Sequence, residues 1–178
     1  MAVLIEGISV VIRCRSIVEK VPGGIAYFMR MLPNKTLRSD GELACVHFVS
    51  PHETRSYVEA LSGMGLRYKG DDGAAVDLVV VDQMHGPMVS CDWLGFGCAD
   101  WDDDPRQPVA VCFAPPAVKA KVMAPEGWRY ADSLSANGKF VAGVDASSNL
   151  VFLRQDDGVD VFVDRETGKE FFLPKLKR

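Results

Sequence analysis

A short stretch of the chain, residues 82–93, carries the side chains best suited to chemistry. It contains Asp82, His85, Cys91 and Asp92. A thiol, an imidazole and a carboxylate close together can act as nucleophile, base and orienting acid. The stretch directly follows an apolar run, and binding sites in proteins with helices on a sheet gather where strands end in loops. We therefore take these four residues as candidate binding residues, without a catalytic assignment.

The same stretch has a purely structural interpretation. Gly86 and Pro87 favour a turn, Asp82 can cap backbone amides, and Trp93 can anchor the loop in the core. The spacing of the reactive side chains matches no recognised catalytic motif. The sequence leaves both interpretations open.

The spacing of possible metal ligands predicts no metal site and no cofactor. Cys91 and Cys98 are seven residues apart, whereas structural zinc sites use close cysteine pairs. The acidic run 100–104 lacks the glycine and the glutamate that a calcium loop requires. His47 is a lone histidine on an apolar strand, which is typical of a hydrogen-bonded core residue.

Aromatic residues in loop-rich stretches indicate a different kind of function. Trp101 and Trp128 lie in such stretches, and tryptophan is a favoured anchor at protein interfaces. They complete the set of candidate binding residues. The preferred hypothesis is a non-enzymatic, soluble, bacterial-type accessory domain that binds another protein. The alternative is a small-molecule-binding domain or enzyme that uses residues 82–93.

Composition limits the class of protein. The chain has 178 residues, 48% of them apolar and 25% charged, which is typical of a globular protein. Its net charge of −4 argues against nucleic-acid binding. Five cysteines without an export signal indicate free thiols in a reducing compartment, and no apolar stretch is long enough to span a membrane. We expect a cytoplasmic protein whose oligomeric state the sequence leaves open.

The elements that must position these residues are strands and helices in the first two thirds of the chain. Apolar, β-branched runs predict strands at 4–13, 44–49 and 76–81. Ser50, Pro51 and Glu53 form a strong helix start, so a helix follows the second strand. An apolar stripe predicts another helix, with Ile25, Phe28, Met29 and Leu32 facing inward.

The remainder of the chain reads as β-structure. Strands are predicted at 93–96 and 109–113, and at 139–144, 150–154, 159–164 and 169–173. We predict an α+β fold, a single mixed sheet with two or three helices packed on it, followed by a C-terminal antiparallel β-meander. One domain over 1–178 is expected, with a possible division into a core (1–114) and the meander (128–174).

Residues 44–113 have the order strand, capped helix and three strands. This order resembles one βαβββ module of the vicinal-oxygen-chelate, or glyoxalase, family. The resemblance implies a metal-binding histidine at His47 on the first strand. That family also uses a glutamate near its last strand, and residues 109–113 contain none.

Overall fold

The computed structural model describes residues 1–116, 121–137, 150–156, 159–164, 168 and 170–174. It confirms the predicted α+β class. The strands are divided among three sheets, with orders β3-β4-β2-β5-β6, β7-β8-β1-β9 and β10-β11-β12. The predicted single sheet is therefore wrong, because the strands form three sheets. Within the described residues, no helix has the length and apolar character needed to cross a membrane.

The first predicted strand is broken into two strands that belong to different sheets. Strand β1 (Ala2–Ile5) joins the four-stranded sheet, and β2 (Ile8–Arg13) lies in the middle of the five-stranded one. The break falls at Glu6 and Gly7, and Gly7 has a φ of 55°. That left-handed conformation is easy for glycine and ends the extended chain. A continuous apolar pattern cannot reveal such a break.

The five-stranded sheet is antiparallel throughout. Strand β2 pairs with β4 (Leu43–Phe48) on one side and with β5 (Leu78–Asp82) on the other. The short strands β3 (Arg38–Ser39) and β6 (Gly86–Pro87) form its edges. Every residue of β4 and β5 is buried, as the apolar runs predicted.

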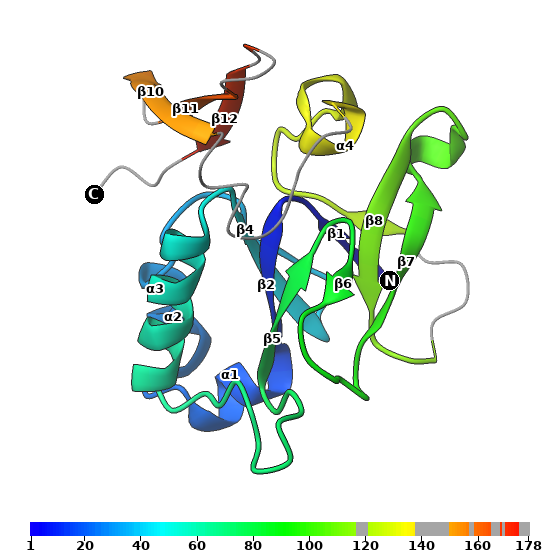
Figure 1. Ribbon diagram of the computed structural model, residues 1–178. Coiled ribbons are helices and arrows are strands. Elements are labelled where there is room, and N and C mark those ends of the chain that lie inside the picture. Colours follow the sequence, from blue (N-terminus) through cyan, green and yellow to red (C-terminus); the bar gives the residue numbers. More distant parts are fainter. Residues whose placement is uncertain (117–120, 138–149, 157–158, 165–167, 169, 175–178) are drawn as a thin grey trace.

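Three helices cover one face of this sheet: α1 (Cys14–Lys20), α2 (Gly24–Arg30) and α3 (Pro51–Gly63). Figure 1 shows them together on one side of β2, β4 and β5. Alternate residues of the strands, such as Val10 and Val46, pack against Phe28, Tyr57 and Leu61 of the helices. This period of two is what a strand with two buried faces requires.

The predicted inward face of α2 is partly wrong. Phe28 is buried, but Ile25 is 57% exposed and Met29 is 47% exposed. Glycines and a proline limit the helix to seven residues, Gly24–Arg30. A helix of two turns that lies on a neighbouring helix buries a narrow stripe, and the sequence does not show which apolar residues lie outside it.

The other face of the five-stranded sheet packs on the four-stranded sheet. Strand β8 (Pro108–Phe113) pairs with β7 (Gly95–Asp100) and with β1, and β9 (Val122–Met123) pairs parallel to β1. Val3 and Ile5 of β1 pack with Val11 and Val79 between the two sheets. The strand predicted at 93–96 thus begins two residues later and is longer.

The last part of the chain contains short elements and a separate sheet. A 3-10 turn (Tyr130–Asp132) leads into the four-residue helix α4 (Leu134–Asn137). Strands β10 (Leu150–Asp156), β11 (Val159–Asp164) and β12 (Glu170–Pro174) pair antiparallel in sequence order. The strand predicted at 139–144 lies outside the described residues.

The helix start predicted at Ser50 is confirmed. Ser50 Oγ accepts a hydrogen bond from the backbone N–H of Glu53 at 3.4 Å, and Pro51 occupies the first turn. We expect Ser50→Ala to lower the free energy of unfolding by about 1 kcal/mol, because one N–H of the first turn loses its acceptor. Urea denaturation measures the change. Ser62→Ala, near the other end of α3, is the control and should cost less, since Ser62 is exposed and bonds only within its own helix. Equal losses in both variants would contradict the cap.

Candidate functional site

The loop that follows β5 is organised by Asp82. Its side chain is buried, and Oδ1 accepts hydrogen bonds from the backbone N–H groups of Met84 (2.9 Å) and His85 (2.8 Å). His85 Nδ1 lies 2.7 Å from the same oxygen. The second oxygen, Oδ2, is buried without a hydrogen-bond partner among the described residues. Asp82 therefore caps the β5–β6 turn, which is the structural role considered from the sequence.

The other candidate residues of this stretch lie at or near the surface. The His85 side chain is 75% exposed, Asp92 is exposed, and Cys91 is half-buried. Burial, aided by the negative charge of Asp92, raises the pKa of Cys91 to about 11. At neutral pH Cys91 is therefore a thiol and a poor nucleophile. Asp82 and His85 are in contact, but His85 is exposed and Cys91 is a thiol, so the role of these residues in binding stays a prediction.

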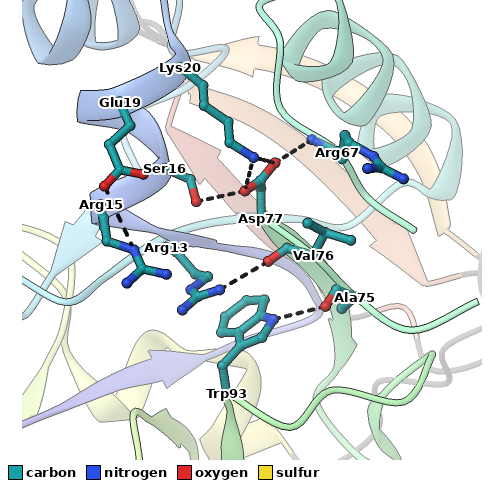
Figure 2. A network of polar contacts seen from close by, with 10 residues as sticks. All are labelled: Arg13, Arg15, Ser16, Glu19, Lys20, Arg67, Ala75, Val76, Asp77 and Trp93. Atoms are coloured by element: carbon teal, nitrogen blue, oxygen red, sulfur yellow. Dashed lines mark hydrogen bonds and ion pairs between the residues drawn. The ribbon is translucent and has the colours of Figure 1, made fainter. Parts of the chain in front are cut away.

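Trp93 fastens the end of this stretch to the neighbouring loop. Its indole N–H donates to the backbone oxygen of Ala75 at 3.0 Å, and the Arg13 guanidinium lies 5.4 Å from its ring centroid. Figure 2 shows the hydrogen bond from Trp93 to Ala75 beside a network centred on the carboxylate of Asp77. Trp93 is half-buried, and it acts as an anchor for the chain leading into β7.

Asp77 is a second buried carboxylate, and both of its oxygens accept hydrogen bonds. It accepts hydrogen bonds from Ser16 Oγ (2.7 Å), from Lys20 Nζ (2.8 Å to each oxygen) and from the Arg67 backbone N–H (2.8 Å). Burial alone would raise its pKa, but these donors together lower it. The network joins α1 to the start of β5 (Figure 2), and its role is structural.

The two remaining candidates, Trp101 and Trp128, are brought together by the fold. Their ring centroids are 4.4 Å apart in an edge-on arrangement, and Tyr130 lies 6.3 Å from Trp128. This cluster packs on the outer face of the four-stranded sheet, over Leu4 and Val111. Both tryptophans are half-buried. They form the edge of a core rather than a flat exposed patch.

Trp128 also lines a cavity of about 280 Å³ between the edge of the two sheets and the segment 125–134. We call it the Glu6–His47 cavity. Its walls come from parts of the chain far apart in sequence. The lining residues are Glu6, Lys35, Thr36, His47, Val49, Pro125, Glu126, Gly127, Trp128, Arg129, Asp132, Ser133 and Leu134. Of the six residues predicted from sequence, Trp128 is the one found in this lining.

His47 is held in one tautomer. It is buried, and its Nδ1 lies 2.9 Å from Arg38 Nη1. Arginine can only donate, so Nδ1 must accept and the proton of the neutral ring is on Nε2. Burial and the Arg38 charge lower the pKa of His47 well below its ordinary value. The cavity thus has a neutral imidazole with a fixed N–H donor.

Arg38 is itself buried, at 3% exposure. Besides His47 it donates to the backbone oxygens of Leu4 (2.7 Å) and Thr36 (2.9 Å) and to Ser9 Oγ (3.2 Å). These acceptors are all uncharged. The guanidinium is positioned by the backbone of β1 and the loop before β3, which explains why His47 cannot rotate freely.

Glu6 forms the opposite polar group of the cavity. Its carboxylate is 3% exposed. Oε2 accepts from the Trp128 indole N–H at 3.0 Å, and Oε1 accepts from the backbone N–H (3.2 Å) and hydroxyl (3.1 Å) of Ser135. The sequence analysis missed Glu6. The available signal was an acidic residue inside an apolar run, directly before Gly7.

The glyoxalase-like order does not form one module. Strands β4, β5 and β6 lie in one sheet with β2 between β4 and β5, whereas β7 and β8 lie in the other. His47 faces Arg38, a cation, and the described residues contain no group of three or more histidine, cysteine or acidic side chains that could hold a metal ion. The structure therefore does not bear out the implied metal histidine.

Comparison with known proteins gives no family. No family model matches the chain, and no significant similarity is found to a curated protein or to a solved structure. The cavity itself is therefore the feature of this protein that indicates a function.

The neutral state of His47 predicts a pH dependence. The unfolded chain binds a proton at His47 as pH falls below about 6.5, but the folded chain does not until a lower pH. Stability contributed by neutral His47 is thus full above that value and is lost on acidification, by at most about 1.4 kcal/mol per pH unit. Urea denaturation between pH 7.5 and 5 measures this slope.

In His47→Gln the slope should become shallower, because glutamine does not titrate. His52→Gln removes another exposed histidine, one that does not contact Asp82, and is the matched control, which should keep the wild-type slope. If wild type and His47→Gln lose stability in parallel as pH falls, the neutral, Arg38-bonded state of His47 is wrong.

Proposed function

We propose that the protein binds a compact polar small molecule in the Glu6–His47 cavity. The observation that carries this proposal is the pair of fixed polar groups on the cavity wall, the His47 Nε2–H donor and the Glu6 carboxylate. Each is held by other protein groups before any ligand arrives, His47 by buried Arg38 and Glu6 by half-buried Trp128 and Ser135. Such pre-organised polar groups in a concave site determine the orientation of a ligand.

Binding is better supported than catalysis. The lining contains no cysteine. The hydroxyl of Thr36 lies 2.5 Å from Asn34 Oδ1, and that of Ser133 donates to the Tyr130 backbone oxygen at 2.6 Å. A hydroxyl held in this way is not activated by a base. The proposal is therefore non-enzymatic, like the preferred hypothesis from the sequence. Its ligand, a small molecule, is that of the alternative hypothesis, but at a site other than residues 82–93.

The indole and amide N–H groups of the cavity are natural reporters of binding. In a ¹H–¹⁵N titration with a library of small polar compounds, we expect some members to shift the Trp128 indole and Ser135 amide signals, since both N–H groups donate to Glu6. The Trp93 indole is the internal control, because it donates to Ala75 and does not line the cavity. A library that moves neither reporter, or moves Trp93 equally, would contradict binding at this site.

A protein partner is the second candidate, and the exposed side of α2 favours it. Ile25 and Met29 are four residues apart on this helix and both are largely exposed. Residues at this spacing lie on one face, so together they present an apolar stripe to solvent. We propose that this stripe contacts another protein, and a second copy of the chain is the partner that can be tested directly.

Sedimentation velocity over a range of protein concentrations tests this second candidate. The wild-type sedimentation coefficient should rise with concentration, and the double variant Ile25→Lys, Met29→Lys should remain monomeric. Met88→Lys, at another exposed methionine, is the control and should behave as wild type. A wild-type protein that stays monomeric throughout would overturn self-association through α2.

A reducing compartment such as the cytoplasm is part of the same proposal. All five cysteines are free thiols: Cys14, Cys45, Cys91, Cys98 and Cys112. Free thiols persist where glutathione and thioredoxin keep them reduced.

A further inference from the structure

The carboxylate of Glu6 is buried and has no cationic partner among the residues that the structure describes. Its three donors, the Trp128 indole and the N–H and hydroxyl of Ser135, are all uncharged. Buried carboxylates are ordinarily paired with a cation or with a metal ion, because removal from water is costly. Asp77 shows the ordinary case in this same molecule, since Lys20 lies 2.8 Å from it.

The two cationic side chains of the cavity lining leave Glu6 without a partner. Arg129 forms an ion pair with Asp132, another lining residue. Lys35 is exposed and forms no ion pair with Glu6. The three lining carboxylates, Glu6, Glu126 and Asp132, outnumber these two cations, and His47 is neutral. The lining side chains therefore carry one more negative than positive charge. The buried Arg38 guanidinium, which bonds His47 and does not line the cavity, donates to neither oxygen of the Glu6 carboxylate.

The aromatic wall favours a cation as well. Trp128 lines the cavity, and its hydrogen bond to Glu6 fixes the indole beside the carboxylate. The ring of Trp101 packs edge-on against it, with the two ring centroids 4.4 Å apart. The carboxylate meets the N–H edge of the indole, so the cation that this wall favours is one that extends from the carboxylate over the face of the ring, which attracts positive charge.

From these contacts we infer that the ligand of the Glu6–His47 cavity carries an ammonium group, which binds Glu6 beside Trp128. This inference rests on the proposed small-molecule function and names its ligand class. The His47 Nε2–H group donates a hydrogen bond to an acceptor atom of the same ligand, such as a hydroxyl or carboxylate oxygen. Buried Arg38 strengthens this donor, because its positive charge at Nδ1 polarises the imidazole and makes the Nε2–H group bond an electron-rich ligand atom more strongly.

The test compares ligands of the same shape and different charge on the wild-type protein. The probes are 3-amino-1-propanol, its diol analogue 1,3-propanediol, and the acid analogue 3-hydroxypropanoate. The Trp128 indole and Ser135 amide signals are followed at pH 7.5. We expect the amine to bind about ten-fold or more tightly than the diol, the usual scale for a charge-assisted hydrogen bond, and the acid to bind more weakly still.

Two variants locate the charge that is recognised. Glu6→Gln should abolish the preference for the amine, and Glu59→Gln, at an exposed carboxylate of α3 outside the lining, should retain it. The ligand series on wild type decides the question even if Glu6→Gln does not fold.

The outcomes separate the two proposals. If the diol or the acid binds as well as the amine, the ammonium assignment is wrong while a ligand in the cavity stands. A preference that survives in folded Glu6→Gln overturns the role of Glu6. If none of the three probes and no member of the wider library shifts the reporters, both the ligand class and the proposed function fall.

Discussion

The guanidinium of Arg38 is the interaction on which the arrangement of the two sheets depends. It joins β1 through the Leu4 oxygen, β2 through the Ser9 hydroxyl and β4 through His47. These strands belong to different sheets, so one side chain connects both. A buried cation needs all its donors satisfied, because desolvation costs more than a single hydrogen bond returns. Removing any one of these acceptors therefore weakens the connection between the sheets.

The cavity is a consequence of the same junction. At Glu6 and Gly7 the chain passes from one sheet to the other. There the Gly7 N–H donates to Gln83 Oε1 at 2.8 Å, and the Gln83 backbone N–H donates to the Gly7 oxygen at 3.0 Å. Ser9 Oγ donates to the Glu6 backbone oxygen at 3.0 Å and accepts from Arg38. The polar groups of the cavity are thus held by contacts that also hold the sheets. A site built on such rigid elements is pre-organised for its ligand.

The buried charges of this protein serve two purposes. Asp77 has a cation and two further donors and does not line the Glu6–His47 cavity, which is the pattern of a structural ion pair. Glu6 has neutral donors and lines a cavity. Since a protein gains little stability from a buried charge without a counter-charge, the difference between these two carboxylates is the physical basis for assigning function to Glu6.

Local features of the chain were predictable from sequence. The cap at Ser50, the helix behind it and the buried strands β4, β5 and β8 follow from neighbouring residues, since capping and apolar runs act over a few positions. Trp128, a candidate binding residue from the sequence, lines the cavity, and its role in binding stays a prediction. The sequence by itself thus determined these elements and the α+β class.

Only the tertiary structure decided where those elements meet. Glu6 and Trp128 are 122 residues apart, and Glu6 and Ser135 are 129 apart, so no local pattern relates them. The break at Gly7, which divides one apolar run between two sheets, depends on a single backbone angle. The outward position of Ile25 and Met29 depends on which stripe of α2 the neighbouring elements cover. Long-range packing determines these features, because the free energy that selects them comes from contacts between segments that the sequence keeps apart.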